Sequence, residues 1–119
     1  MLTNLDPKIF YVDLDEGIEF FVTGLRFEVL QRDASMALVG RDGAIAYLVG
    51  NAVSAAIEQL EIGIDTDNID AIHEEISKHA AYLLHPDSST ISLRPWGTRE
   101  FSVRGNSVAR VTFREWPKK

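Results

Sequence analysis

The stretch RPWGTREFSVR, residues 94–104, decides the fold more than any other part of the sequence. A proline and a glycine flank Trp96, and residues 100–104, in the predicted strand over 98–104, then alternate polar and apolar side chains. Such alternation predicts a strand with one face on a core and a polar opposite face. An indole beside a flexible glycine can lie flat over a planar ligand. We therefore expect Trp96 to close a small-molecule pocket, or alternatively to plug the end of the sheet.

Residues around this stretch complete a repeated unit. Residues 107–114 form a second alternating run, joined to the first by Gly105 and Asn106, a pair that tolerates positive φ in a hairpin turn. Upstream, the pattern predicts a strand over 60–64, a helix over 67–79 and a short strand over 82–84, followed by a serine-rich loop.

The first half of the chain shows the same order of elements. The predicted elements are a strand over 9–12, a helix over 13–24 that stops at Gly24, and strands over 26–32, 36–40 and 44–49. A D-x-D pattern recurs at residues 13–15 and 65–67, each time after an apolar strand and before a helix. The sequence therefore predicts one α+β domain of two β-α-β-β-β modules, at about 5–50 and about 58–115.

Composition and charge disfavour several classes of function. The net charge of −6 and the absence of a basic face disfavour nucleic-acid binding. No apolar run approaches the roughly 18 residues that span a bilayer, so we expect no membrane partner. Residues 1–8 lack the basic and apolar regions of a signal peptide, and the sequence contains no cysteine, so we expect a cytoplasmic protein. An acidic surface favours a cationic ligand, or else serves only solubility.

Two segments resemble the vicinal oxygen chelate superfamily, in its bleomycin-resistance and glyoxalase-like branch. Residues 12–28 resemble the family's strand, helix and "LGFE" segment, and residues 94–104 resemble its "PWG-REF-V" segment. The likeness covers nearly the whole chain. Two departures mark a divergent member: Arg26 stands in place of the usual glycine in "LGF", and the "DPDGN" turn is shortened to Gly105 and Asn106.

The resemblance implies two modules whose mixed sheets curl into a cleft, commonly in a homodimer. Metal-dependent members place His or Glu on the inner faces of four strands, and alignment by eye puts Asp6, Ala46, Glu61 and Arg110 near those places. Alanine has no donor atom, and a guanidinium has no lone pair to offer. We therefore expect a metal-free member without a cofactor. If Ala46 faces the cleft, the next residue, Tyr47, belongs to the core or an interface.

Four residues are the candidate ligand contacts: Trp96, Glu61, Arg110 and Arg99. By strand alternation, Glu61 and Arg110 project to the same side and form a charged pair that holds a polar ligand, or alternatively a structural ion pair. Arg99 and Glu100 flank the strand that follows Trp96, and the alternative for them is a solvent-facing pair of little energetic weight.

Other polar residues are better explained by structure than by chemistry. Asp13 with Glu16, and Asp67 with Asp70, stand at predicted helix starts, where carboxylates cap backbone N–H groups. His73 and His79 lie on different faces of one helix and cannot form an i, i+4 metal pair. No nucleophile triad or phosphate-binding loop is apparent.

These observations predict a metal-independent protein that sequesters a small molecule, such as a bleomycin-type antibiotic, and that forms a homodimer. The alternative is a metal-dependent enzyme of the glyoxalase or dioxygenase type. A third hypothesis is a dimeric interaction module that no longer binds a small molecule.

Overall fold

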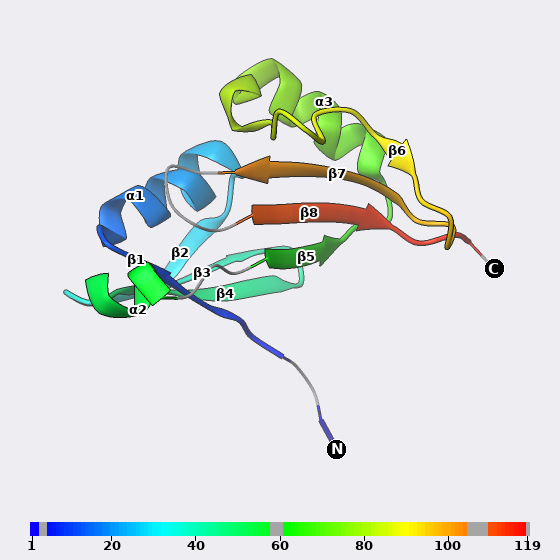
Figure 1. Cartoon of the computed structure of the whole chain (residues 1–119). Coiled ribbons are helices and arrows are strands. Elements are labelled where there is room, and N and C mark those ends of the chain that lie inside the picture. The colour runs from blue at the N-terminus through cyan, green and yellow to red at the C-terminus, as the bar shows by residue number, and fades with distance from the viewer. Residues whose placement is uncertain (3–4, 58–60, 105–109, 119) are drawn as a thin grey trace. The chain divides into compact units, whose positions relative to one another are not determined.

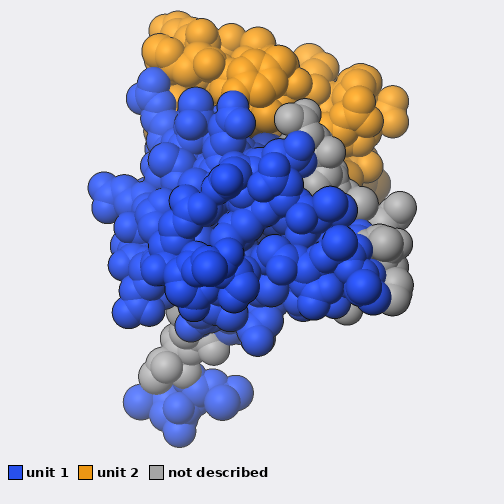
Figure 2. Space-filling view, turned by 90° about the vertical axis from the view of Figure 1, so that its left-hand side faces the viewer, with its two compact units in different colours: residues 1–60, 106–108 blue, residues 61–105, 109–119 orange. Residues whose placement is uncertain are grey.

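The computed structural model describes residues 1–2, 5–57, 61–104 and 110–118. The chain divides into two compact units (Figure 2): Met1–Leu60 with Asn106–Val108, and Glu61–Gly105 with Ala109–Lys119. Each unit contains one four-stranded mixed sheet, so the predicted α+β class with two similar halves is confirmed. No helix among the described residues is long and apolar enough to cross a membrane.

The first unit has the strand order β1-β4-β3-β2, with β1 parallel to β4 (Figure 1). Its elements are β1 (Lys8–Tyr11), α1 (Leu14–Ile18), the π-helix η1 (Glu19–Gly24), β2 (Glu28–Arg32), β3 (Met36–Arg41), β4 (Ala44–Gly50) and α2 (Ala52–Ile57). Asp13 caps α1 as expected, because its side chain accepts from the Asp15 N–H at 2.9 Å. Helix α2 was not predicted.

Helix α1 packs on one face of this sheet. A Cβ added to Gly17 would meet the Tyr11 ring at 2.6 Å, and one added to Gly50 would meet the Leu14 Cβ at 3.3 Å. Ala46 shares the face of Gly50 and is buried. The alignment that put Ala46 on the inner, cleft-lining face was therefore wrong, and Tyr47 occupies the opposite face.

The helix of the first unit ends in a way that explains the departure at Arg26. The Leu25 N–H donates to the Phe20 carbonyl, and the Phe27 N–H donates to the Phe21 carbonyl. Arg26 lies between them with φ 60°, the left-handed conformation that glycine adopts without steric cost. The predicted stop of the helix at Gly24 is therefore confirmed, and Arg26 adopts the backbone that a glycine at this position would favour.

The second unit has the strand order β5-β8-β7-β6, with β5 parallel to β8. Its elements are β5 (Glu61–Asp65), α3 (Ile69–His79), the 3₁₀ turn η2 (Ala81–Leu83), β6 (Ser92–Leu93), β7 (Arg99–Arg104) and β8 (Arg110–Glu115). The predicted strand over 82–84 was wrong: η2 takes its place, and Leu84 forms only an isolated bridge to Val103. The predicted turn at Gly105 and Asn106 lies outside the described residues.

Helix α3 covers one face of the second sheet (Figure 1). Phe101 and Phe113 stack at 5.2 Å, and His73 from α3 meets the Phe101 ring edge-on at 4.8 Å. The other buried apolar side chains of this core are Ile69, Ile76, Ala80, Leu83, Val103 and Val111. The predicted alternation of β7 and β8 is thus confirmed for their apolar residues. We call the face away from α3 the open face of the second sheet.

Candidate functional site

The segment around Trp96 is a tight hairpin loop between β6 and β7. The Gly97 N–H donates to the Arg94 carbonyl at 2.9 Å, and the Arg94 N–H donates to the Thr98 carbonyl at 2.8 Å. Pro95 restricts φ at the second turn position, and Gly97 has φ 101°, which L-residues rarely adopt. Trp96 sits at the tip and is 63% exposed. The proline and the glycine thus present an indole to the outside.

The C-terminal segment supports this loop. A Cβ added to Gly97 would lie 3.2 Å from Cγ of Pro117, so the two residues are already in close approach. The neighbouring Trp116 ring lies 5.6 Å from the Arg114 guanidinium, in cation–π geometry. Two tryptophans therefore belong to the same end of the second unit.

The predicted pair Glu61 and Arg110 lies at the other end of the open face. The two residues are register partners in the parallel β5–β8 ladder, and Arg110 Nε is 3.8 Å from Glu61 Oε1. Arg110 Nη2 also donates to Ser88 Oγ at 2.8 Å. Their predicted proximity is confirmed, while a role in ligand binding stays a prediction.

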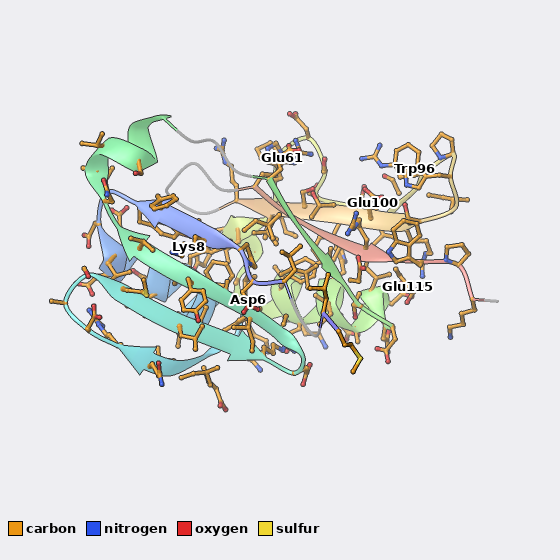
Figure 3. The ribbon with its side chains drawn as sticks, turned by 90° about the horizontal axis from the view of Figure 1, so that it is seen from below. Asp6, Lys8, Glu61, Trp96, Glu100 and Glu115 are labelled. Carbon is orange, nitrogen blue, oxygen red and sulfur yellow. The ribbon has the colours of Figure 1, made fainter. Side chains whose placement is uncertain are left out.

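Trp96 and Glu61 lie apart in the second unit (Figure 3). Strand β7 runs from Arg99 to Arg104, and Arg104 is the register partner of Arg110. The strand length of about 17 Å at 3.4 Å per residue separates the two ends. A ligand that contacts both Trp96 and Arg110 must therefore lie along the strands.

The middle of the open face carries a second ion pair. Arg114 Nε and Nη2 both bond to Asp65 Oδ1, at 3.1 and 3.0 Å. A Cβ on Gly63 would lie 2.7 Å from the Arg114 guanidinium, so the glycine makes room for Arg114 to lie flat on β5. Ser102 and Thr112 add a hydroxyl pair at 2.8 Å.

Arg99 and Glu100 do not form the solvent-facing pair that was the alternative for them. The two residues point to opposite faces of β7, and Glu100 is only 8% exposed. Thr98 Oγ1 donates to Glu100 Oε2 at 2.5 Å, and Arg94 Nε lies 3.6 Å from Oε1, too far for a hydrogen bond. Glu100 therefore belongs to the open face and forms no pair with Arg99.

The loop over residues 85–89 was not predicted to matter, yet it holds Ser88 beside Arg110. The His85 N–H donates to the Ser102 carbonyl and the Ser102 N–H donates to the Ser88 carbonyl, both at 2.9 Å. His73 Nε2 contacts the Ser89 carbonyl at 2.7 Å, and so ties the loop to α3. Because these contacts join distant parts of the sequence, no local pattern signals them.

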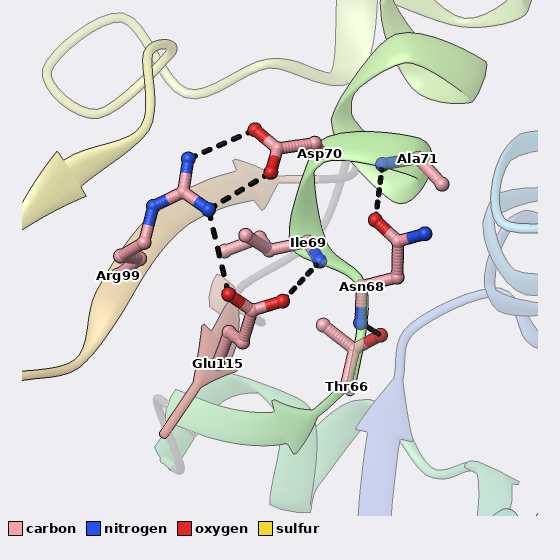
Figure 4. A network of polar contacts seen from close by, with 7 residues as sticks. All are labelled: Thr66, Asn68, Ile69, Asp70, Ala71, Arg99 and Glu115. Carbon is pink, nitrogen blue, oxygen red and sulfur yellow. Dashed lines mark hydrogen bonds and ion pairs between the residues drawn. The ribbon is translucent and has the colours of Figure 1, made fainter. Parts of the chain in front are cut away.

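Arg99 lies on the face covered by α3 and joins a network at the start of that helix (Figure 4). Its guanidinium binds both oxygens of Asp70 at 2.8 Å and reaches Glu115 Oε2 at 3.4 Å. Glu115 Oε1 accepts from the Ile69 N–H at 3.1 Å. The cap residue is Asn68, which accepts from the Ala71 N–H, so the expected capping by Asp67 and Asp70 was wrong.

This network makes part of the stability dependent on pH. The hydrogen bonds from Arg99 hold the pKa of Asp70 below its ordinary value. Because the folded pKa is lowered, the contribution is complete above the unfolded pKa, which is about 4, and is lost as the pH falls through the folded value. We expect Asp70→Asn and Arg99→Gln to flatten the same acid part of the stability curve, measured by urea unfolding between pH 2 and 7. Unchanged acid slopes would contradict this.

Comparisons with known proteins identify the fold. No protein-family model and no curated protein matches the chain. Among solved structures, a bleomycin-binding protein complexed with bleomycin has a TM-score of 0.80 at 13% identity, over 98% of this chain and 100% of that one. The bleomycin-binding protein from bleomycin-producing Streptomyces verticillus, complexed with copper(II)-bleomycin, has a TM-score of 0.75 at 23% identity, over 99% and 100%. A lactoylglutathione lyase from Agrobacterium tumefaciens has a TM-score of 0.74 at 15% identity, over 97% and 95%.

The chain has the fold of these bleomycin-binding proteins and of this lyase, which is the fold expected from the resemblance to the vicinal oxygen chelate superfamily. The resemblance at residues 12–28 and 94–104 is thereby confirmed at the level of fold. Binding proteins and an enzyme share this fold, so the fold alone does not decide between the two functions.

The resemblance to the vicinal oxygen chelate superfamily suggests a metal site, and the side chains that could act as ligands test this for the described residues. No group of three His, Asp or Glu side chains among them is placed to hold one ion. Glu61 has as its neighbour the guanidinium of Arg110, which has no lone pair to offer. These two residues therefore do not fit a divalent cation, and we derive no step that uses one.

Proposed function

We propose that the chain is a metal-independent cytoplasmic protein that binds and sequesters a small molecule, with a bleomycin-type antibiotic as the first candidate. The observation that carries the proposal is the polar strip of the open face, from Glu61 and Arg110 to the Trp96 loop. Structures with the same fold include bleomycin-binding proteins complexed with bleomycin, which supports this candidate. We further propose a homodimer.

The strip offers several kinds of recognition to an elongated ligand. Trp96 supplies a flat apolar surface, the ion pair of Arg114 and Asp65 lies at mid-strip, and Glu61 with Arg110 lies at the far end. Arg99 is left out of the proposed contacts because its guanidinium is engaged by Asp70 and Glu115. Recognition here needs hydrogen bonds, charge and stacking, but no catalytic group.

Titration with a bleomycin-type drug, followed by tryptophan fluorescence and calorimetry, tests the proposal. We expect Trp96→Phe and Arg110→Gln each to weaken binding about tenfold, the loss of one well-placed contact. Tyr82→Ala is the matched control, because Tyr82 is 73% exposed in η2, outside the strip. Trp116→Phe leaves Trp96 as the single tryptophan and assigns the fluorescence signal to it.

Two results would overturn the proposal. No heat and no quenching with the drug, and no protection of cells that express the protein, would remove this ligand. Stoichiometric zinc, nickel, manganese or iron in the purified protein, lost in Glu61→Ala, would favour the metal-dependent enzyme.

A further inference from the structure

Two arginines face each other at the end of the β7–β8 hairpin. Arg104 and Arg110 are register partners in this antiparallel pair, so their side chains rise from the same open face. The Cβ atoms of directly opposed residues lie about 5 Å apart, and like charges in this position repel. Negative charge close to such a pair reduces this repulsion.

The described residues provide little of that charge. Glu61 is the one carboxylate in this row of the sheet, and it lies 3.8 Å from Arg110 Nε with a side chain that is 75% exposed. Arg104 is exposed, and its side chain has no hydrogen bond or ion pair to the parts of the chain that the structure describes. The sequence between the two arginines, GNSVA at 105–109, contains no acid. The row thus carries an excess of positive charge in a chain whose net charge is −6.

A hydroxyl group completes the arrangement. Ser88 Oγ accepts from Arg110 Nη2 at 2.8 Å, which leaves the Ser88 O–H proton to donate elsewhere. The serine is held in place by the backbone bond from Ser102 and by the contact of His73 with Ser89. Arg110 is 32% exposed, so part of its guanidinium faces outward beside this hydroxyl.

We propose that Arg104, Arg110 and Ser88 form a binding site for an oxyanion, a carboxylate, sulfate or phosphate group of the ligand. Guanidinium groups bind such oxygens through paired, charge-assisted N–H bonds, and the serine adds a third donor. The inference that the ligand carries an acidic group rests on the proposed function, whereas the anion site itself can be measured with inorganic anions. From net charge we expected a cationic ligand; the site instead favours a ligand that is acidic at this end of the strip.

Calorimetric titration with inorganic phosphate, sulfate and benzoate, at constant ionic strength set with chloride, tests the site. We expect Arg104→Gln and Ser88→Ala to weaken binding of the best anion about fivefold, and Arg104→Lys to restore part of the loss. Arg32→Gln is the control, because Arg32 pairs with Asp15 in the first unit. Glu61→Gln should strengthen anion binding about threefold, because it removes a competing carboxylate.

The outcomes separate this proposal from the proposed function. No anion binding, or equal losses in Arg104→Gln and Arg32→Gln, overturns the oxyanion site even where the bleomycin-type drug binds. Anion binding with the expected variant pattern supports the site even where the drug does not bind. Weaker anion binding in Glu61→Gln would also contradict it, because that carboxylate would then help rather than compete. Thermal melts of each variant confirm that the exposed substitutions leave the fold intact.

Discussion

Replacing Gly97 with alanine should lower the free energy of unfolding by about 2 kcal/mol, the usual cost of a strained backbone conformation. Gly97 has φ 101°, where a Cβ is strained whatever the surrounding space. The new methyl would also meet Pro117 Cγ at 3.2 Å, so the C-terminal segment would have to shift. Because Gly97 follows Trp96 in the hairpin loop, ligand affinity should fall together with stability.

Gly43→Ala is the matched control for this substitution. A Cβ at Gly43 meets nothing within 4 Å, and its φ lies outside the left-handed range. We expect its stability to stay within about 0.5 kcal/mol of the wild type. The double variant Gly97→Ala with Pro117→Ala separates the two costs, since it removes the contact and keeps the backbone strain. Urea unfolding curves for the four proteins provide the measurement; a Gly97→Ala protein as stable as Gly43→Ala would refute the argument.

The core of the second unit could be predicted from the sequence because a strand has a period of two residues. Phe101, Val103, Val111 and Phe113 alternate strictly with polar neighbours, and all four are buried. Any register of the hairpin that keeps this alternation buries the same side chains. The same rule could not predict which way Ala46 faces, because β4 has the sequence AIAYLVG and is apolar at every position. Its buried face is decided by packing on α1.

The polar residues were harder to predict, because their partners are far apart in the sequence. The stretch DTDN at 65–68 offers several candidate caps, and the backbone places Asn68 at the cap position. Asp70 was thereby left to bind Arg99, 29 residues away. Glu100 is buried, and its carboxylate contacts Thr98 and lies near Arg94, both from the hairpin loop. Burial of a polar side chain thus depends on loop geometry that alternation does not encode.

Only part of the candidate site could be predicted, because the contacts of its other residues also join distant parts of the sequence. Glu61 and Arg110 were predicted from the resemblance to metal-dependent members of the family and from strand alternation, and the parallel register of β5 and β8 brings them together. Arg104 was passed over, since its importance depends on which residue of β8 stands opposite it. Ser88 lies in a loop without a repeating pattern, and only its bonds to β7 and β8 give it a role.

Replacing Glu115 with alanine should destabilise the second unit by about 2 kcal/mol, the value of a hydrogen bond to a charged group. The Glu115 side chain is only 16% exposed, and its Oε1 accepts from the Ile69 N–H at the first turn of α3. Without it, this N–H is left without its partner at the start of the helix. Loss of the contact from Oε2 to Arg99 adds to the effect.

Glu115→Gln is the matched control, because it keeps an acceptor oxygen for Ile69 and removes the charge that attracts Arg99. We expect it to retain more than half of the lost stability, and Asp70→Asn to leave the Ile69 bond intact. Hydrogen exchange at the Ile69 amide gives the local measurement: exchange should accelerate in Glu115→Ala and stay slow in Asp70→Asn. Equal exchange rates in both variants would show that the helix start is held by its apolar packing, chiefly by buried Ile69 and Ile76, and not by the carboxylate at the end of β8.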